Sequence, residues 1–82
     1  MYVYILTDSY GNLLATSTKL YGMKHFLKKN IEEFPEILKQ GDKWFLKEYV
    51  LYRARIGHPT GTYGIPEKMD DEYVTELVKG VI

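Results

Sequence analysis

The sequence predicts a small α+β fold, in which a three-stranded antiparallel sheet is packed on one face by two helices in the chain order ββαβα. Three observations predict it. An apolar amino-terminal segment ends in a cluster of turn residues, a stripe of apolar residues at helical spacing follows, and the middle of the chain has a two-residue hydrophobic rhythm. Because the chain has 82 residues, we expect one domain over residues 1–82.

The amino-terminal segment predicts a β-hairpin. Residues 1–7, MYVYILT, are apolar or aromatic on both alternating faces, which is typical of a central strand. Residues 8–12, DSYGN, are turn formers, and Gly11 tolerates positive φ. Residues 13–17 are therefore expected to return as the second strand.

The next segment predicts an amphipathic helix that begins after a cap at Ser17 or Thr18 and ends near Glu33. Its apolar stripe consists of Leu20, Met23, Leu27, Ile31 and Phe34. Pro35 disfavours a helical conformation for the residue before it. Residues 35–41 are accordingly expected to form a turn or an irregular connection.

Residues 43–56, KWFLKEYVLYRARI, favour a long strand, because aromatic and β-branched residues are frequent in it. One alternating set comprises Trp44, Leu46, Val50, Tyr52, Ala54 and Ile56, and the other comprises Lys47, Tyr49, Arg53 and Arg55. Glu48 breaks the rhythm, so we expect a bend, a bulge or a split near Lys47 and Glu48. Aromatic residues also recur there at helical spacing, and a helix stays open as the alternative.

The carboxy-terminal third predicts a loop and a second helix. Residues 57–66 contain three glycines and two prolines and are expected to form a loop with Tyr63 at its tip. Residues 69–80 are expected to form a helix capped by Asp70 or Asp71, with Gly80 at its end.

The connections predict a sheet of spatial order 2-1-3. If both helices cover the face that carries Val3 and Ile5, the other face is left bare and presents aromatic and basic side chains to a partner. With the loop tip, this candidate partner-binding set is Tyr2, Tyr4, Lys47, Tyr49, Arg53, Arg55 and Tyr63.

The composition argues against several classes of protein. Cysteine is absent, which fits a cytoplasmic location better than secretion, and no apolar run is long enough for a membrane span. His25 and His58 have no patterned ligand partners, so we expect no metal site. The chain also has no nucleophile or phosphate-binding motif, and we expect neither a cofactor nor enzymatic activity.

The candidate set favours stoichiometric binding of another protein, because tyrosine and arginine are common in interface hot spots. Such a protein would be an adaptor or an inhibitor, and a phage or mobile-element inhibitor of a host nuclease or defence system belongs to this class. Two alternatives stay open. The basic, tyrosine-bearing face could bind single-stranded nucleic acid, or the last strand could leave an unpaired edge through which the chain forms a homodimer.

Overall fold

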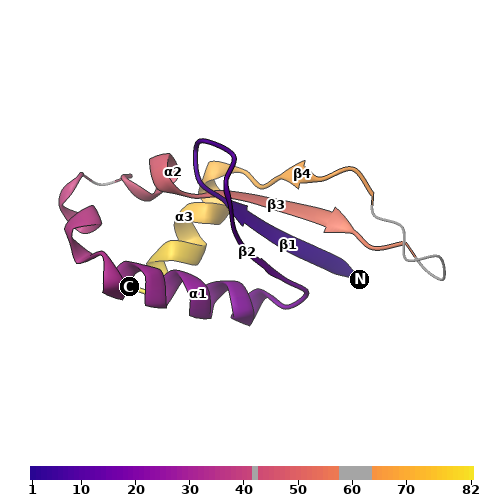
Figure 1. Cartoon of the computed structure of the whole chain (residues 1–82), viewed down its shortest axis with the longest axis horizontal. Helices are drawn as coiled ribbons and strands as arrows, with labels where there is room; N and C mark the ends of the chain where they lie inside the picture. Colours follow the sequence, from indigo (N-terminus) through magenta and orange to yellow (C-terminus); the bar gives the residue numbers. More distant parts are fainter. Residues whose placement is uncertain (42, 58–63) are drawn as a thin grey trace.

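The computed structural model describes residues 1–41, 43–57 and 64–82, and it is a small α+β structure with an antiparallel sheet (Figure 1). The strands are β1 (Tyr2–Thr7), β2 (Leu13–Ser17), β3 (Val50–Arg55) and β4 (Glu67–Lys68). The helices are α1 (Leu20–Glu33), the 3-10 helix η1 (Pro35–Lys39), α2 (Phe45–Glu48) and α3 (Asp71–Lys79). The molecule is elongated, with extents of 45 × 21 × 20 Å.

The sheet has four strands rather than the predicted three, and their order is β2-β1-β3-β4. The predicted order 2-1-3 is correct within it, and each neighbouring pair is antiparallel. The additional strand, β4, forms only two residue pairs with β3, between Tyr52 and Lys68 and between Arg53 and Glu67. The edge of β3 is therefore partly covered by β4, where the sequence predicted an unpaired edge.

The hairpin of β1 and β2 forms as predicted, and hydrogen bonds within its turn satisfy backbone N–H groups of the turn residues. The Asp8 carboxylate accepts hydrogen bonds from the backbone N–H groups of Tyr10 and Asn12, each at 2.9 Å, and from the Asn12 side chain at 2.9 Å. These hydrogen bonds, chiefly that of the Asn12 side chain, hold the pKa of Asp8 below its usual value. Gly11 has a φ of 87°, which only glycine adopts at little cost.

Helix α1 ends at Glu33 as predicted, one residue before the position that Pro35 restricts. Its start differs from the prediction, because the cap position is Lys19 and carries no side-chain cap hydrogen bond. The hydroxyl of Ser17 accepts a hydrogen bond from the Lys19 N–H at 3.1 Å and so closes the turn that precedes the helix.

Helix α3 is capped by Asp70, one of the two predicted residues. Its carboxylate accepts a hydrogen bond from the Tyr73 N–H at 2.8 Å, which satisfies one of the free donors of the first turn. The buried face of α3 consists of Val74, Leu77 and Val78.

The long segment of residues 43–56 is split into the single-turn helix α2 and the strand β3. Three aromatic side chains explain the split. Trp44, Phe45 and Tyr49 are all buried in one core, with ring centroids 5.5 Å apart for Trp44–Phe45 and 6.1 Å apart for Trp44–Tyr49. A continuous strand would place Trp44 and Phe45 on opposite faces, whereas a helical turn places both in the core.

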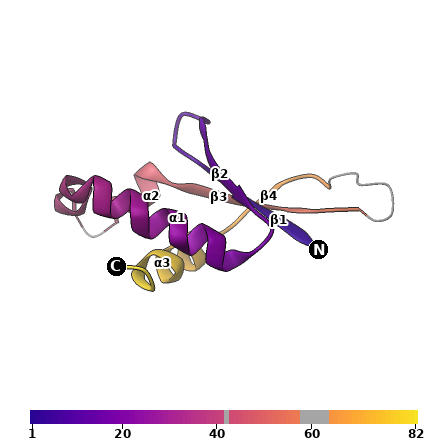
Figure 2. The same ribbon diagram turned by 60° about the horizontal axis from the view of Figure 1, so that its bottom comes forward.

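The helices cover the face of the sheet opposite to the predicted one. Leu6 of β1 and Leu51 of β3 pair across the strands and are each 1% exposed in the core with α1 and α3 residues. Figure 2 shows α1 and α3 on the same side of the sheet. Since side chains alternate along a strand, Val3 and Ile5 lie on the side away from these helices, and the prediction that the helices cover them is wrong.

The helices also leave one end of the sheet uncovered. In Figures 1 and 2 the start of β1, marked by the amino terminus, and the end of β3 extend beyond α1 and α3. Tyr2 and Arg55 pair across the strands at this projecting end.

Candidate functional site

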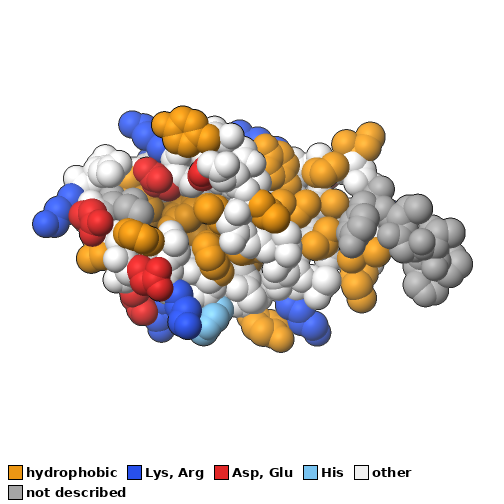
Figure 3. Space-filling view, in the orientation of Figure 1, with side chains coloured by type: hydrophobic (Ala, Val, Ile, Leu, Met, Phe, Trp, Pro, Cys, Tyr) orange, Lys and Arg blue, Asp and Glu red, His pale blue; other side chains and the backbone are white. Residues whose placement is uncertain are grey.

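The side of the sheet away from the helices forms an open, mainly apolar face. The register places Val3 opposite Ala54, and Ile5 opposite Tyr52 on one side and Thr16 on the other. We call these residues the open face: Val3, Ile5, Thr16, Tyr52 and Ala54. Figure 3 shows hydrophobic side chains gathered over β1 and β3 on the side turned to the viewer.

A shallow hollow of about 430 Å³ lies on the open face. It is lined by Val3, Ile5, Thr16, Ala54, Gly64 and Pro66. The Gly64 N–H donates a hydrogen bond to the Arg55 carbonyl at 2.7 Å, which holds the 64–66 segment at the rim. Ile65 in that segment is 94% exposed. The mainly apolar lining of the hollow and the protruding isoleucine at its rim give this face a shape that another apolar surface can fit.

The opposite side of the projecting end carries a cluster of tyrosine and arginine residues. The guanidinium carbon of Arg53 lies 4.5 Å from the centroid of the Tyr2 ring, within the range of a cation–π interaction. One terminal nitrogen of Arg53 lies 3.7 Å from a carboxylate oxygen of Glu67. Tyr4 pairs with Arg53 across the strands, and Tyr2 pairs with Arg55.

Tyr73 of α3 completes this cluster from the helix side. Burial, followed by the neighbouring Tyr4 hydroxyl, raises the pKa of Tyr73, while the positive charge of Arg53 lowers it. The net effect is a raised pKa, so Tyr73 presents a protonated hydroxyl beside Arg53 at neutral pH. The sequence did not indicate Tyr73 as a site residue, because its spacing in α3 is that of a core residue.

The structure brings together four of the seven predicted site residues. Tyr2, Tyr4, Arg53 and Arg55 share the helix-side face of the sheet. Lys47 is exposed on α2, apart from that strand face. Tyr63 lies outside the described residues.

Tyr49 does not belong to a surface in this structure, since it is 3% exposed and part of the core. Its hydroxyl donates a hydrogen bond to the Asn30 side-chain oxygen of α1. Burial, with a smaller contribution from the charge of Glu48, raises the pKa of Tyr49 to about 12. The prediction that Tyr49 is an accessible contact residue is therefore wrong, because its ring packs against Trp44 in the core.

The open face was missed because the sequence assigned its residues to the core. Both alternating sets of β1 are apolar, so the pattern of β1 alone could not decide which set faces the helices. In β3, the set with Val50, Tyr52 and Ala54 is the more apolar, and this favoured the wrong face. The residue of β3 that indicates the buried face is Leu51, which is apolar and alternates with Arg53 and Arg55 on the same side of the strand.

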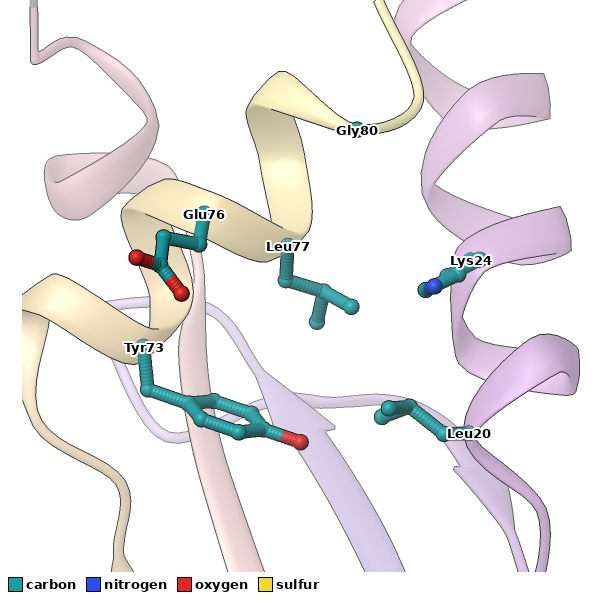
Figure 4. Close-up of a pocket in the computed structure, with 6 residues that line it drawn as sticks. All are labelled: Leu20, Lys24, Tyr73, Glu76, Leu77 and Gly80. Carbon is teal, nitrogen blue, oxygen red and sulfur yellow. The ribbon is translucent and has the colours of Figure 1, made fainter.

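A second hollow, of about 270 Å³, lies between α1 and α3 (Figure 4). Leu20 and Lys24 approach it from α1, and Tyr73, Glu76 and Leu77 line it from α3. In Figure 4 the Glu76 carboxylate points away from the Lys24 ammonium group, so this hollow does not bring an acid and a base together. It offers no arrangement suited to general acid–base chemistry.

The described part of the chain holds no group of three or more metal-ligating side chains. No helix in residues 1–41, 43–57 and 64–82 is both long and apolar enough to cross a membrane.

Comparisons with known proteins give no relative from which a role could be carried over. No protein-family model, no curated protein and no solved structure matches this chain.

Proposed function

We propose that this chain binds another protein stoichiometrically through the open face of its sheet, as an adaptor or an inhibitor. The observation that carries this proposal is an apolar sheet face with neither helix over it. An antiparallel sheet with one solvated face normally places polar residues on that face. Here the partly exposed Val3 and Ile5 and the buried Ala54 occupy it instead, with the exposed Ile65 at its rim.

Val3 and Ile5 are partly exposed and Ile65 is 94% exposed, and apolar surface left open to solvent in this way supports an interaction site. The hollow is shallow and open, which suits a protein surface better than a small molecule that needs a deep, enclosing pocket. A covering protein would remove Val3, Ile5 and Ile65 from water, and this burial supplies a driving force for association.

The distribution of charge favours a protein over a nucleic acid on this face. Both arginines of the chain, Arg53 and Arg55, lie on the other side of the sheet. Among the described strand residues, Lys68 is the cation that the register places on the open side, opposite Tyr52. One lysine gives little of the phosphate neutralisation on which nucleic-acid binding depends.

A lysine at the centre of the open face tests the proposal. We expect Val3→Lys to weaken partner binding about 30-fold or more, which corresponds to about 2 kcal/mol, the threshold of an interface hot spot. The tagged wild-type protein is used to capture partners from a nuclease-treated lysate of the source organism. The captured protein is then purified, and its affinity and 1:1 stoichiometry are measured by titration calorimetry.

The matched control is Leu38→Lys, which replaces an exposed apolar residue of η1 by lysine, away from the open face on which Val3 is partly exposed. It is expected to bind like the wild type, and the circular dichroism of both variants should show an intact fold. Equal binding by Val3→Lys, or loss of the captured material on nuclease treatment, would reject the proposal. Self-association of the pure protein through this face would identify a second copy as the partner.

A further inference from the structure

We propose that Arg53 and Arg55, on the reverse side of the projecting end, form a carboxylate-binding site for an acidic segment of the partner protein. This inference rests on the proposed function, since it names the chemistry of part of the same partner. The projecting strands would then contact the partner with both faces, an apolar one and a cationic one.

Arg53 is held in place before any ligand arrives. Its guanidinium group lies over the Tyr2 ring at 4.5 Å and is 3.7 Å from Glu67, and its side chain is 31% exposed. A guanidinium group that is already ordered loses little conformational freedom when it binds a carboxylate.

One donor of this group is unused within the described residues. The Nε atom of Arg53 is buried and has no hydrogen-bond acceptor there. Because this atom is out of reach of solvent, an incoming carboxylate would bind through the terminal nitrogens of the partly exposed side chain, whose geometry matches that of a carboxylate. Glu67 contacts a terminal nitrogen of Arg53 rather than this atom.

Arg55 supplies a second, more accessible cation on the same face. It lies two residues after Arg53 on β3 and opposite Tyr2 on β1, and it is exposed. In the described ranges no carboxylate lies within ion-pair distance of Arg55. Both arginines therefore neighbour Tyr2, Arg53 through its guanidinium group and Arg55 through the strand register, and this arrangement suits a segment with one or two carboxylates.

The acidic residue nearby favours a carboxylate ligand over a polyphosphate. The Glu67 carboxylate lies 3.7 Å from Arg53 and offsets part of its charge. It repels a chain with one negative charge per residue. A peptide with two separated carboxylates approaches with far less repulsion.

The chain has only two arginines, so the test has a simple readout. Arginine labelled with ¹⁵N gives two side-chain Nε–H signals in an NMR correlation spectrum. The probe is a blocked five-residue peptide with glutamate at its second and fourth positions, titrated into the protein without any partner. We expect both signals to shift and to saturate, whereas the same peptide with glutamine at both positions shifts them at least tenfold less.

Arg55→Gln is expected to weaken binding of the glutamate peptide at least tenfold, as followed by the remaining Arg53 signal. The matched control is Lys68→Gln, which removes the same charge from β4 on the open side of the sheet and should leave the affinity unchanged. Equal shifts with the glutamine peptide, or equal weakening by Lys68→Gln, would overturn the assignment. Tighter binding of a six-nucleotide thymidine oligomer than of the peptide would also overturn it, in favour of nucleic acid.

The two proposals fail separately. If the peptide leaves both arginine signals unchanged while Val3→Lys still abolishes partner capture, the carboxylate site is wrong and the open-face interface stands.

Discussion

Leu6→Ala is expected to lower the free energy of unfolding by about 2–5 kcal/mol, the usual cost of a large-to-small substitution in a packed core. Leu6 is 1% exposed and packs in the cluster that contains Leu51, Leu27 and Val78. Ile5→Ala, one residue earlier, is expected to cost at most about 1.5 kcal/mol, because Ile5 lies on the open face and loses less buried area. Urea unfolding at neutral pH measures both values.

These adjacent residues form a matched pair, since each substitution removes the same number of side-chain carbons from the same central strand. The comparison therefore reports which face of β1 the helices cover. A larger loss of stability for Ile5→Ala than for Leu6→Ala would place the helices on the other face.

Tyr49→Ala is expected to destabilise the protein by about 3–5 kcal/mol, because it removes an aromatic ring that packs against Trp44 in the core. Tyr49→Phe keeps the ring but removes the hydrogen bond to Asn30, and it is expected to cost about 1–2 kcal/mol. Thermal and urea unfolding measure both variants. A Tyr49→Ala variant with the stability of the wild type would show that the ring lies outside the core.

The Tyr49 hydroxyl also makes the free energy of unfolding depend on pH in the alkaline range. Its pKa is about 12 in the folded protein and 10.0 without perturbation, so the unfolded chain loses this proton first. The contribution of Tyr49 is complete below pH 10 and is lost as the pH rises toward about 12. Over this range the wild type should lose more stability than Tyr49→Phe. Parallel curves for the two proteins would contradict the buried, protonated state of Tyr49.

Elements that depend on local sequence were predicted well. The hairpin follows from the Asp8–Asn12 turn, the end of α1 follows from Pro35, and the cap of α3 follows from Asp70. Each of these signals acts over a few residues and through the backbone, so tertiary packing does not reverse it.

The segment around α2 shows where periodicity fails. Trp44 and Phe45 are adjacent, and both enter the core, which no regular strand allows. The sequence indicated a break near Lys47 and Glu48 through the misplaced charge. The helical spacing of the aromatic residues left a helix open as the alternative, and the structure forms one over Phe45–Glu48. The two-residue strand β4 was not predicted, because it depends on pairing with β3 rather than on its own composition.

The exposed face could not be predicted because the choice between two apolar faces depends on long-range packing. Arg53 and Arg55 made the helix-side face of β3 look solvent-facing. In the structure they lie toward the projecting end, where Arg53 contacts Tyr2 and Glu67 and does not have to enter the apolar core. The prediction of one bare sheet face led to the proposed role, while the identity of that face came from the positions of Leu6 and Leu51.

The accessibility of the open face, with and without the captured partner, tests the central claim most directly. In a methyl NMR spectrum of the free protein, a water-soluble paramagnetic agent should strongly broaden the signals of Val3, Ile5 and Ile65 and spare those of Leu6 and Leu51. Addition of one equivalent of the partner should then protect the first group. Broadening of Leu6 and Leu51 in the free protein, or unchanged broadening of Val3 and Ile5 in the complex, would contradict the claim that the open face is exposed and binds the partner.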